Sequence, residues 1–156
     1  MILKLAGAGI LVSSAAYCAA RMISTEKNKI DRLSAYVEIV SYVKNQIDLY
    51  SMPIEKILKG INSSVLESIG ITHAPSRFDD IIVSDESVSE QTQKTLRDFS
   101  FSLGKSYREM QIKLCDKAIT ELEKQKKELT DAFPSRKKTI VVLCFSACGM
   151  AIIALI

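Results

Sequence analysis

The sequence contains few of the residue types on which metal sites and catalysis depend. It has one histidine, no tryptophan, three prolines and four cysteines among 156 residues. The cysteines form no C-x-x-C pair, and no zinc-binding set is apparent with a single histidine. We therefore interpret the cysteines as small hydrophobic residues, because free cysteine is most often buried. They are Cys18, Cys115, Cys144 and Cys148.

Sequence motifs of catalysis are also missing. There is no nucleophile elbow, phosphate-binding loop, glycine-rich dinucleotide turn or H-E-x-x-H motif. Gly104-Lys105-Ser106 matches the end of a phosphate-binding loop, but position 99 is Phe99 where the first glycine should be. His73 has no partner motif, and Asp79 and Asp80 are neighbours with no accompanying metal ligand. The sequence thus predicts no catalytic, cofactor-binding or metal-ligating residue, and we expect a protein that is not an enzyme.

Neither positive nor negative charge is in large excess. The chain has 21 lysines and arginines against 18 aspartates and glutamates, a formal net charge of +3. This excess is too small to indicate nucleic-acid binding. The apolar fraction of 47% excludes wholesale disorder. We expect neither nucleic acid nor a small-molecule substrate as a partner.

The apolar residues are concentrated at the two ends of the chain. The stretch 139–156 has no charged residue over 18 positions, which is about 27 Å as a helix and near the thickness of a bilayer core. The stretch 5–20 is also uncharged, and it becomes long enough to span if Lys4 snorkels. We predict transmembrane helices at 1–22 and 135–156, with a cytoplasmic helical domain between them at 23–134.

The first apolar segment has other interpretations. A short basic start followed by an apolar run also describes a signal peptide. Cys18 would fit a lipoprotein site, but the bulky Tyr17 before it differs from the small residue that such cleavage favours. A retained anchor is favoured over a cleaved signal by the length and the flanking charges.

Basic residues flank both apolar segments on the side of the middle domain. They are Arg21, Lys27, Lys29 and Arg32 after the first segment, and Lys124, Lys126, Lys127, Arg136, Lys137 and Lys138 before the second. Because lysine and arginine stay on the cytoplasmic side, we expect the middle domain to face the cytoplasm. The same residues can contact anionic headgroups, so membrane lipid is an expected partner.

The middle of the chain has helical periodicity almost throughout. A stripe of apolar residues predicts a helix from near Asn28 to Tyr50, made of Ile30, Leu33, Val37, Val40 and Ile47. Pro53 starts a short helix that Gly60 ends, and another turn or two precedes Gly70. Residues 81–83 have strand propensity, but without a second strand we expect packed coil. The predicted fold class is all-α, a membrane-anchored antiparallel helical bundle with a transmembrane helix at each end.

A helix–turn–helix corner dominates the second half of the chain. Ser87 and Glu90 form a capping box that opens a helix, and Leu103-Gly104 ends it. Ser106 and Glu109 form a second capping box. This box opens a long helix from about Tyr107 to Asp131, with Met110, Leu114, Ala118 and Leu122 as its buried stripe. Pro134 is expected to separate that helix from the second anchor.

The corner resembles the stage III sporulation protein AB family. The residues that carry the resemblance are L-G-x-S at 103–106, Gln111, Leu122-Glu123 and the Met52-Pro53-Ile54 junction after Tyr50. Two features depart from the family, since Tyr107 replaces an expected acidic residue and 61–86 is shortened. The family in turn resembles the cytoplasmic helical domain of F-type platform proteins of type II secretion and type IV pilus assembly.

The resemblance implies a non-enzymatic platform or adaptor in the membrane. It would belong to a secretion-like complex in the envelope between mother cell and forespore, needed for sporulation. Implied partners are the other proteins of that complex, including a secretion-type ATPase, on the mother-cell side. We also expect Arg108, Gln111 and Lys113 to contribute to a protein contact from the exposed face of the long helix. The alternative is a membrane-anchored regulatory or sensor module built on the same helices.

Overall fold

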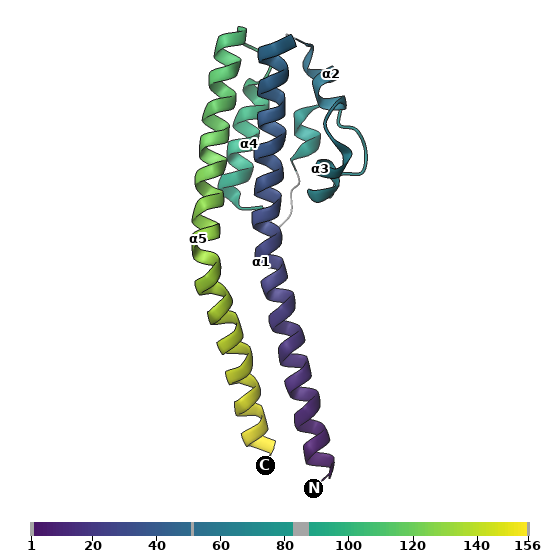
Figure 1. Ribbon diagram of the computed structural model, residues 1–156, viewed down its shortest axis with the longest axis vertical. Coiled ribbons are helices and arrows are strands. Elements are labelled where there is room, and N and C mark those ends of the chain that lie inside the picture. The colour runs from purple at the N-terminus through teal and green to yellow at the C-terminus, as the bar shows by residue number, and fades with distance from the viewer. Residues whose placement is uncertain (1, 51, 83–87, 156) are drawn as a thin grey trace. The chain divides into compact units, whose positions relative to one another are not determined.

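A computed structural model describes residues 2–50, 52–82 and 88–155 of the chain, which are helices and connecting turns (Figure 1). The side chains of residues 2–6, 8, 154 and 155 are outside this description. The elements are α1 (Ile2–Tyr50), α2 (Ile54–Lys59), α3 (Ser63–Ser68), the 3-10 helix η1 (Phe78–Ile81), α4 (Glu90–Ser102) and α5 (Arg108–Leu155). The described part contains no strand, which confirms the all-α prediction.

The chain divides into two compact units. The middle unit is Lys29–Leu129, and the end unit combines Met1–Asn28 with Thr130–Ile156. The middle unit contains one part of each long helix together with all of the shorter helices. Each unit is described separately below.

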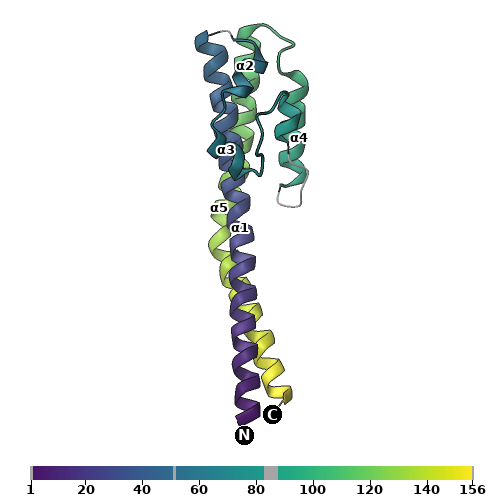
Figure 2. The same ribbon diagram turned by 90° about the vertical axis from the view of Figure 1, so that its right-hand side faces the viewer.

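The core of the middle unit lies where α1, α4 and α5 pack together. In both views α5 runs antiparallel to α1 and to α4 (Figures 1 and 2). The most deeply buried side chains include Tyr36, Ile39, Val40 and Val43 from α1, Leu96 and Phe99 from α4, and Cys115 and Leu122 from α5. Each large apolar side chain buried in this way stabilises the fold by about 1.5–3 kcal/mol relative to exposure. The antiparallel helical bundle is therefore confirmed for this unit.

The short helices end where the sequence predicts. Pro53 stands at the N-cap of α2 and Gly60 at its C-cap. Asn62 caps α3 by accepting a hydrogen bond from the Ser64 backbone N–H at 3.0 Å. Gly70 follows α3 with φ of +88°, a left-handed conformation that glycine adopts without strain. Local residue chemistry is sufficient to place these boundaries.

The 3-10 helix η1 precedes α4 and includes Ile81, the first residue of the predicted coil at 81–83; Ile82 is coil as predicted, and Val83 lies outside the described residues. The Asp80 carboxylate accepts from the backbone N–H groups of Arg77 (2.9 Å) and Ser76 (3.0 Å), and these two bonds lower the pKa of Asp80. Asp79 accepts from the Ser100 hydroxyl on α4 at 2.5 Å. Phe78 packs edge-on against Phe99, with ring centroids 4.8 Å apart. The two neighbouring carboxylates therefore have structural roles.

Both predicted capping boxes were placed incorrectly. Helix α4 begins at Glu90, and its cap is Ser89, whose Oγ accepts from the Thr92 backbone N–H at 3.1 Å. Ser87 lies outside the described residues. Helix α5 begins at Arg108, which puts Tyr107 at the cap position and excludes a box between Ser106 and Glu109.

The buried stripe of α5 also differs from the predicted one. Met110 is 60% exposed, whereas Cys115 is fully buried together with Leu122. The predicted helix break at Pro134 is wrong, because α5 continues through this residue to Leu155. A proline inside a helix removes one backbone hydrogen bond and crowds the preceding turn, at a cost of about 3 kcal/mol, but the neighbouring turns retain their own bonds.

The end unit consists of the first part of α1 and the last part of α5. An ion pair joins them, with Nη1 of Arg136 2.8 Å from Oε2 of Glu26. Across the described residues, no helix combines the length and the apolar character that a bilayer crossing requires. The two spans predicted at 1–22 and 135–156 are therefore not supported by the structure, in which they are parts of longer helices. Both spans include terminal side chains that lie outside the description.

Many large apolar side chains of the end unit are exposed. They are Ile10, Val12, Tyr17 and Met22 in α1, and Val142, Leu143, Phe145, Met150 and Ile153 in α5. Ala19 and Cys148 are buried within the unit. Soluble monomers rarely leave so much apolar surface in water.

Candidate functional site

Reactive side chains are placed singly in the described part of the molecule. Within it, no group of three histidines, cysteines or acidic residues is arranged to hold a metal ion. His73 is exposed on the loop between α3 and η1. Cys115 is buried, and desolvation raises the pKa of its thiol to about 11. A neutral, buried thiol is a poor nucleophile at neutral pH.

One end of the middle unit carries a group of exposed apolar side chains, which we call the tip surface. Its members are Leu49, Tyr50, Met52, Phe101, Tyr107 and Met110. They come from the end of α1, the end of α4 and the start of α5, which both views place at the same end of the unit (Figures 1 and 2). Tyr107 is 92% exposed and Phe101 is 74% exposed. Such residues are buried in most domains unless they contact a partner.

The chain reaches this arrangement through a sharp turn between α4 and α5. Gly104 has φ of +81°, as predicted for the glycine that ends α4. It lies against Ile54 at the start of α2. A hollow of about 320 Å³ opens beside it, lined by Met52, Pro53, Ile54, Arg108 and Gln111 among others. The glycine allows α2 and the corner to pack closely at this end.

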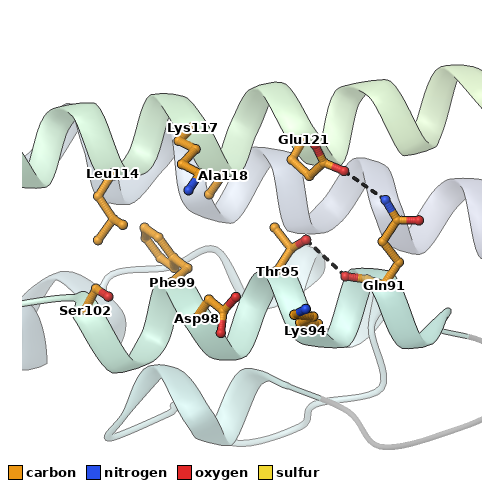
Figure 3. Close-up of a pocket in the computed structure, with 10 residues that line it drawn as sticks. All are labelled: Gln91, Lys94, Thr95, Asp98, Phe99, Ser102, Leu114, Lys117, Ala118 and Glu121. Carbon is orange, nitrogen blue, oxygen red and sulfur yellow. Dashed lines mark hydrogen bonds between the residues drawn. The ribbon is translucent and has the colours of Figure 1, made fainter.

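A second surface feature lies between α4 and α5, and we call it the α4/α5 groove (Figure 3). Its volume is about 370 Å³. Apolar atoms of Phe99, Leu114 and Ala118 contribute to its lining. Charged side chains line it as well, Lys94 and Asp98 from α4 and Lys117 and Glu121 from α5. A groove with apolar and charged lining suits a protein segment better than a reaction.

The comparison with known families agrees with the residues at the corner. Residues 80–156 match the family model of stage III sporulation protein AB (spore_III_AB). The second half of the chain is therefore similar to this family, which supports the resemblance seen in the sequence. No curated protein and no solved structure matches the chain. The matched range contains α4 and α5, and therefore the whole α4/α5 groove and the part of the tip surface contributed by Phe101, Tyr107 and Met110.

The matched family is named for stage III of sporulation. A polar cluster with two buried members joins α4 to α5. The Thr92 hydroxyl donates to Oε1 of Gln125 at 2.6 Å, and both side chains are buried. Glu121 accepts from Nε2 of Gln125 at 3.3 Å and from Nε2 of Gln91 at 2.9 Å, and these bonds lower its pKa. The cluster fixes how the two helices align.

Two of the three residues predicted to contact a partner form an ion pair or a hydrogen bond within the middle unit. Arg108 forms an ion pair with Asp48 of α1, at 2.7 Å between Nη2 and Oδ1. Gln111 is half-buried and donates to the Ser106 carbonyl at 2.6 Å. Lys113 is exposed. A role of these residues in binding stays a prediction, but the first two already have structural partners.

Sequence reasoning did not identify the tip surface. Its residues come from three separate segments, and Met110 had been assigned to the core. One signal was available, because Tyr107 and Phe101 lie off the apolar stripes of their helices. Tyrosine and phenylalanine in such positions are typical of interfaces.

Proposed function

We propose that this chain is a non-enzymatic, membrane-attached adaptor of a secretion-like complex in the envelope between mother cell and forespore. The matched family supports a role in sporulation stage III. The observation that carries the adaptor role is the tip surface, with six large apolar side chains exposed at one end of the middle unit. A surface of this kind is costly in water and is retained where a partner covers it.

The composition of the tip surface favours a protein partner. Tyrosine, phenylalanine and methionine are enriched in the centres of protein interfaces, and aromatic residues contribute much of the binding energy there. Charged side chains border these residues, with Nζ of Lys105 3.4 Å from the centroid of the Phe101 ring. An apolar centre with a polar border is the usual organisation of an interface. The partners in this proposal are other proteins of the complex, including a secretion-type ATPase on the cytoplasmic side.

The end unit supports the membrane part of the proposal. Its exposed apolar side chains need an apolar environment, and the sequence has no charge from position 139 to 156. The basic residues Arg136, Lys137 and Lys138 precede that stretch. In this proposal the end unit attaches to the membrane and the middle unit faces the mother-cell cytoplasm.

Polar substitution of the tip surface tests the adaptor role. In the triple variant Tyr50→Ser, Phe101→Ser and Tyr107→Ser, we expect folding to change little, since exposed positions each shift stability within about 0.5 kcal/mol. Serine at position 107 is also a better helix cap than tyrosine. Association with the envelope complex should weaken at least roughly tenfold, as expected for loss of an aromatic anchor. Co-purification from sporulating cells and heat-resistant spore counts measure the effect.

The matched control changes exposed polar residues of the same unit. Lys59→Ser with Glu67→Ser should leave both co-purification and spore counts at the wild-type level. If the tip variant accumulates normally and still gives full co-purification and full spore counts, the tip surface is not the docking site and the adaptor proposal loses its support.

Thiol labelling tests the orientation of the middle unit. Thr72 is exposed on the loop after α3, so Thr72→Cys provides a reactive site in a chain with Cys18, Cys144 and Cys148 replaced by alanine. An impermeant maleimide should fail to label intact sporulating cells and should label this site after lysis. Cys115 can remain, because its buried thiol with a pKa of about 11 should react only after unfolding. Labelling of the new site before lysis would reverse the proposed orientation.

A further inference from the structure

Four charged side chains of the α4/α5 groove alternate in sign. On α4, Lys94 precedes Asp98 by four residues, and on α5 Lys117 precedes Glu121 by four. The two helices are antiparallel, so Asp98 lies across the groove from Lys117, and Lys94 lies across from Glu121 (Figure 3). Each wall therefore carries one positive and one negative charge, and the order is reversed on the opposite wall.

These charged side chains form no ion pair with one another within the described part of the chain. There, Lys94, Asp98 and Lys117 form no ion pair and no hydrogen bond, and all three are exposed. Glu121 accepts only from the neutral amides of Gln91 and Gln125. Those bonds, and to a smaller extent the charges of Lys124 and Lys117, lower the pKa of Glu121, so it stays ionised at neutral pH.

We propose that the α4/α5 groove is the interface of a homodimer, in which a second copy of this chain docks face to face about a two-fold axis parallel to α4 and α5. Rotation about that axis exchanges the two walls of the groove. Lys117 then meets Asp98 of the second copy, and Lys94 meets Glu121 of the second copy. The symmetry repeats both contacts, which gives four pairs of opposite charge and none of like charge.

The rest of the groove is compatible with this partner. A two-fold interface must be complementary to itself, and the alternating charges meet that condition. The same rotation places α5 of one copy antiparallel to α4 of the other, as in a four-helix bundle. The half-buried Leu114 would be covered at the centre, over the buried Phe99 and Ala118, while the charged pairs fix the alignment. This interface is separate from the tip surface and does not depend on the adaptor role.

Charge reversal in the purified full-length chain, kept in mild detergent, tests the homodimer. Wild type should dimerise in analytical ultracentrifugation, more weakly at high salt. Lys117→Glu should place two carboxylates in contact at each symmetric position, and Asp98→Lys should place two cations in contact. Each single variant should weaken dimerisation at least roughly tenfold, because like charges across an interface are strongly unfavourable. Circular dichroism and thermal unfolding should be unchanged, since the four positions are on the surface.

A mixture of the two single variants is the decisive measurement. In a mixed dimer of Lys117→Glu with Asp98→Lys, every contact is again between opposite charges, so dimerisation should return to near the wild-type level. No effect within one chain can produce this rescue, because each chain carries only one substitution.

A second mixture distinguishes between two possible directions of the two-fold axis. If the axis instead lay across the helices in the plane of the groove, Asp98 would meet Lys94 of the second copy. Rescue by mixing Asp98→Lys with Lys94→Glu, and not by the first mixture, would overturn the axis we propose. A monomeric wild type, or single variants that dimerise like wild type, would overturn the homodimer. Loss of spore yield in the single variants with a monomeric wild type would assign the groove to a different protein.

Discussion

Replacement of Gly104 by valine is expected to destabilise the middle unit by about 2–6 kcal/mol. Two effects add. Gly104 has φ of +81°, where a β-branched residue is strained by about 1–3 kcal/mol. A Cβ at this position would also lie 2.7 Å from Cδ1 of Ile54, closer than carbon atoms can pack. Relieving that overlap requires a shift of the Ile54 side chain, which packs against the core, or of the corner, and overpacking of this kind typically costs about 1–3 kcal/mol.

Gly70 provides the matched control for this prediction. It has φ of +88°, but the nearest atom to a Cβ placed there is Nη2 of Arg32 at 3.9 Å. Gly70→Val should therefore show the conformational strain without the overlap, a loss of about 1–3 kcal/mol. Urea unfolding of both full-length variants measures the difference. Equal losses at the two positions would contradict the steric role of Gly104 against Ile54.

Removal of one partner from the buried Thr92–Gln125 hydrogen bond should cost about 1–3 kcal/mol. Thr92→Val keeps the shape of the side chain but leaves the Gln125 carbonyl without its donor at 2.6 Å. Gln125→Leu removes this acceptor and the bond to Glu121, and leaves the Thr92 hydroxyl with the Ser89 hydroxyl, at 2.7 Å, as a partner. A buried polar atom without a partner loses its hydration and gains nothing in return.

The double variant Thr92→Val with Gln125→Leu is the sharper measurement. Because both polar groups are then absent, the free energy of unfolding should be higher than the sum of the single losses predicts. A coupling of about 0.5–3 kcal/mol is expected from the double-mutant cycle. Strictly additive losses would show that the two side chains do not stabilise each other.

The sequence predicted those features of the fold that depend on neighbouring residues. Gly70 and Gly104 follow helices in a left-handed conformation that glycine adopts without strain, so their positions could be inferred without any tertiary contact. The first long helix could be predicted because one continuous apolar stripe faces the core.

Features that depend on several elements could not be predicted in this way. Helix α5 packs against both α1 and α4, so its buried residues include Cys115 and Gln125 as well as the predicted Ala118 and Leu122, whereas Met110 of the predicted stripe is exposed. The capping boxes failed for a related reason, since more than one serine precedes α4 and only the packed structure selects Ser89.

The candidate surfaces were the least predictable part. A sequence shows that Phe101 and Tyr107 are aromatic, but not that three segments meet and leave them uncovered. The charges of the α4/α5 groove are a stronger example. Lys94 and Asp98 are ordinary surface residues in the sequence, and their relation to Lys117 exists only once the two helices lie antiparallel (Figure 3).

The rate at which a reagent modifies the buried thiol of Cys115 measures local opening of the native chain. A reagent reaches this sulfur only when α5 separates from the core, so the rate of modification equals the rate for the open form multiplied by its population. An opening free energy of about 5 kcal/mol would slow the reaction by roughly several thousand-fold. Any partner that binds only the closed form lowers that population further by mass action. Protection of a single natural cysteine can thus report the affinity of an unlabelled partner, with no probe placed on the surface that the partner covers.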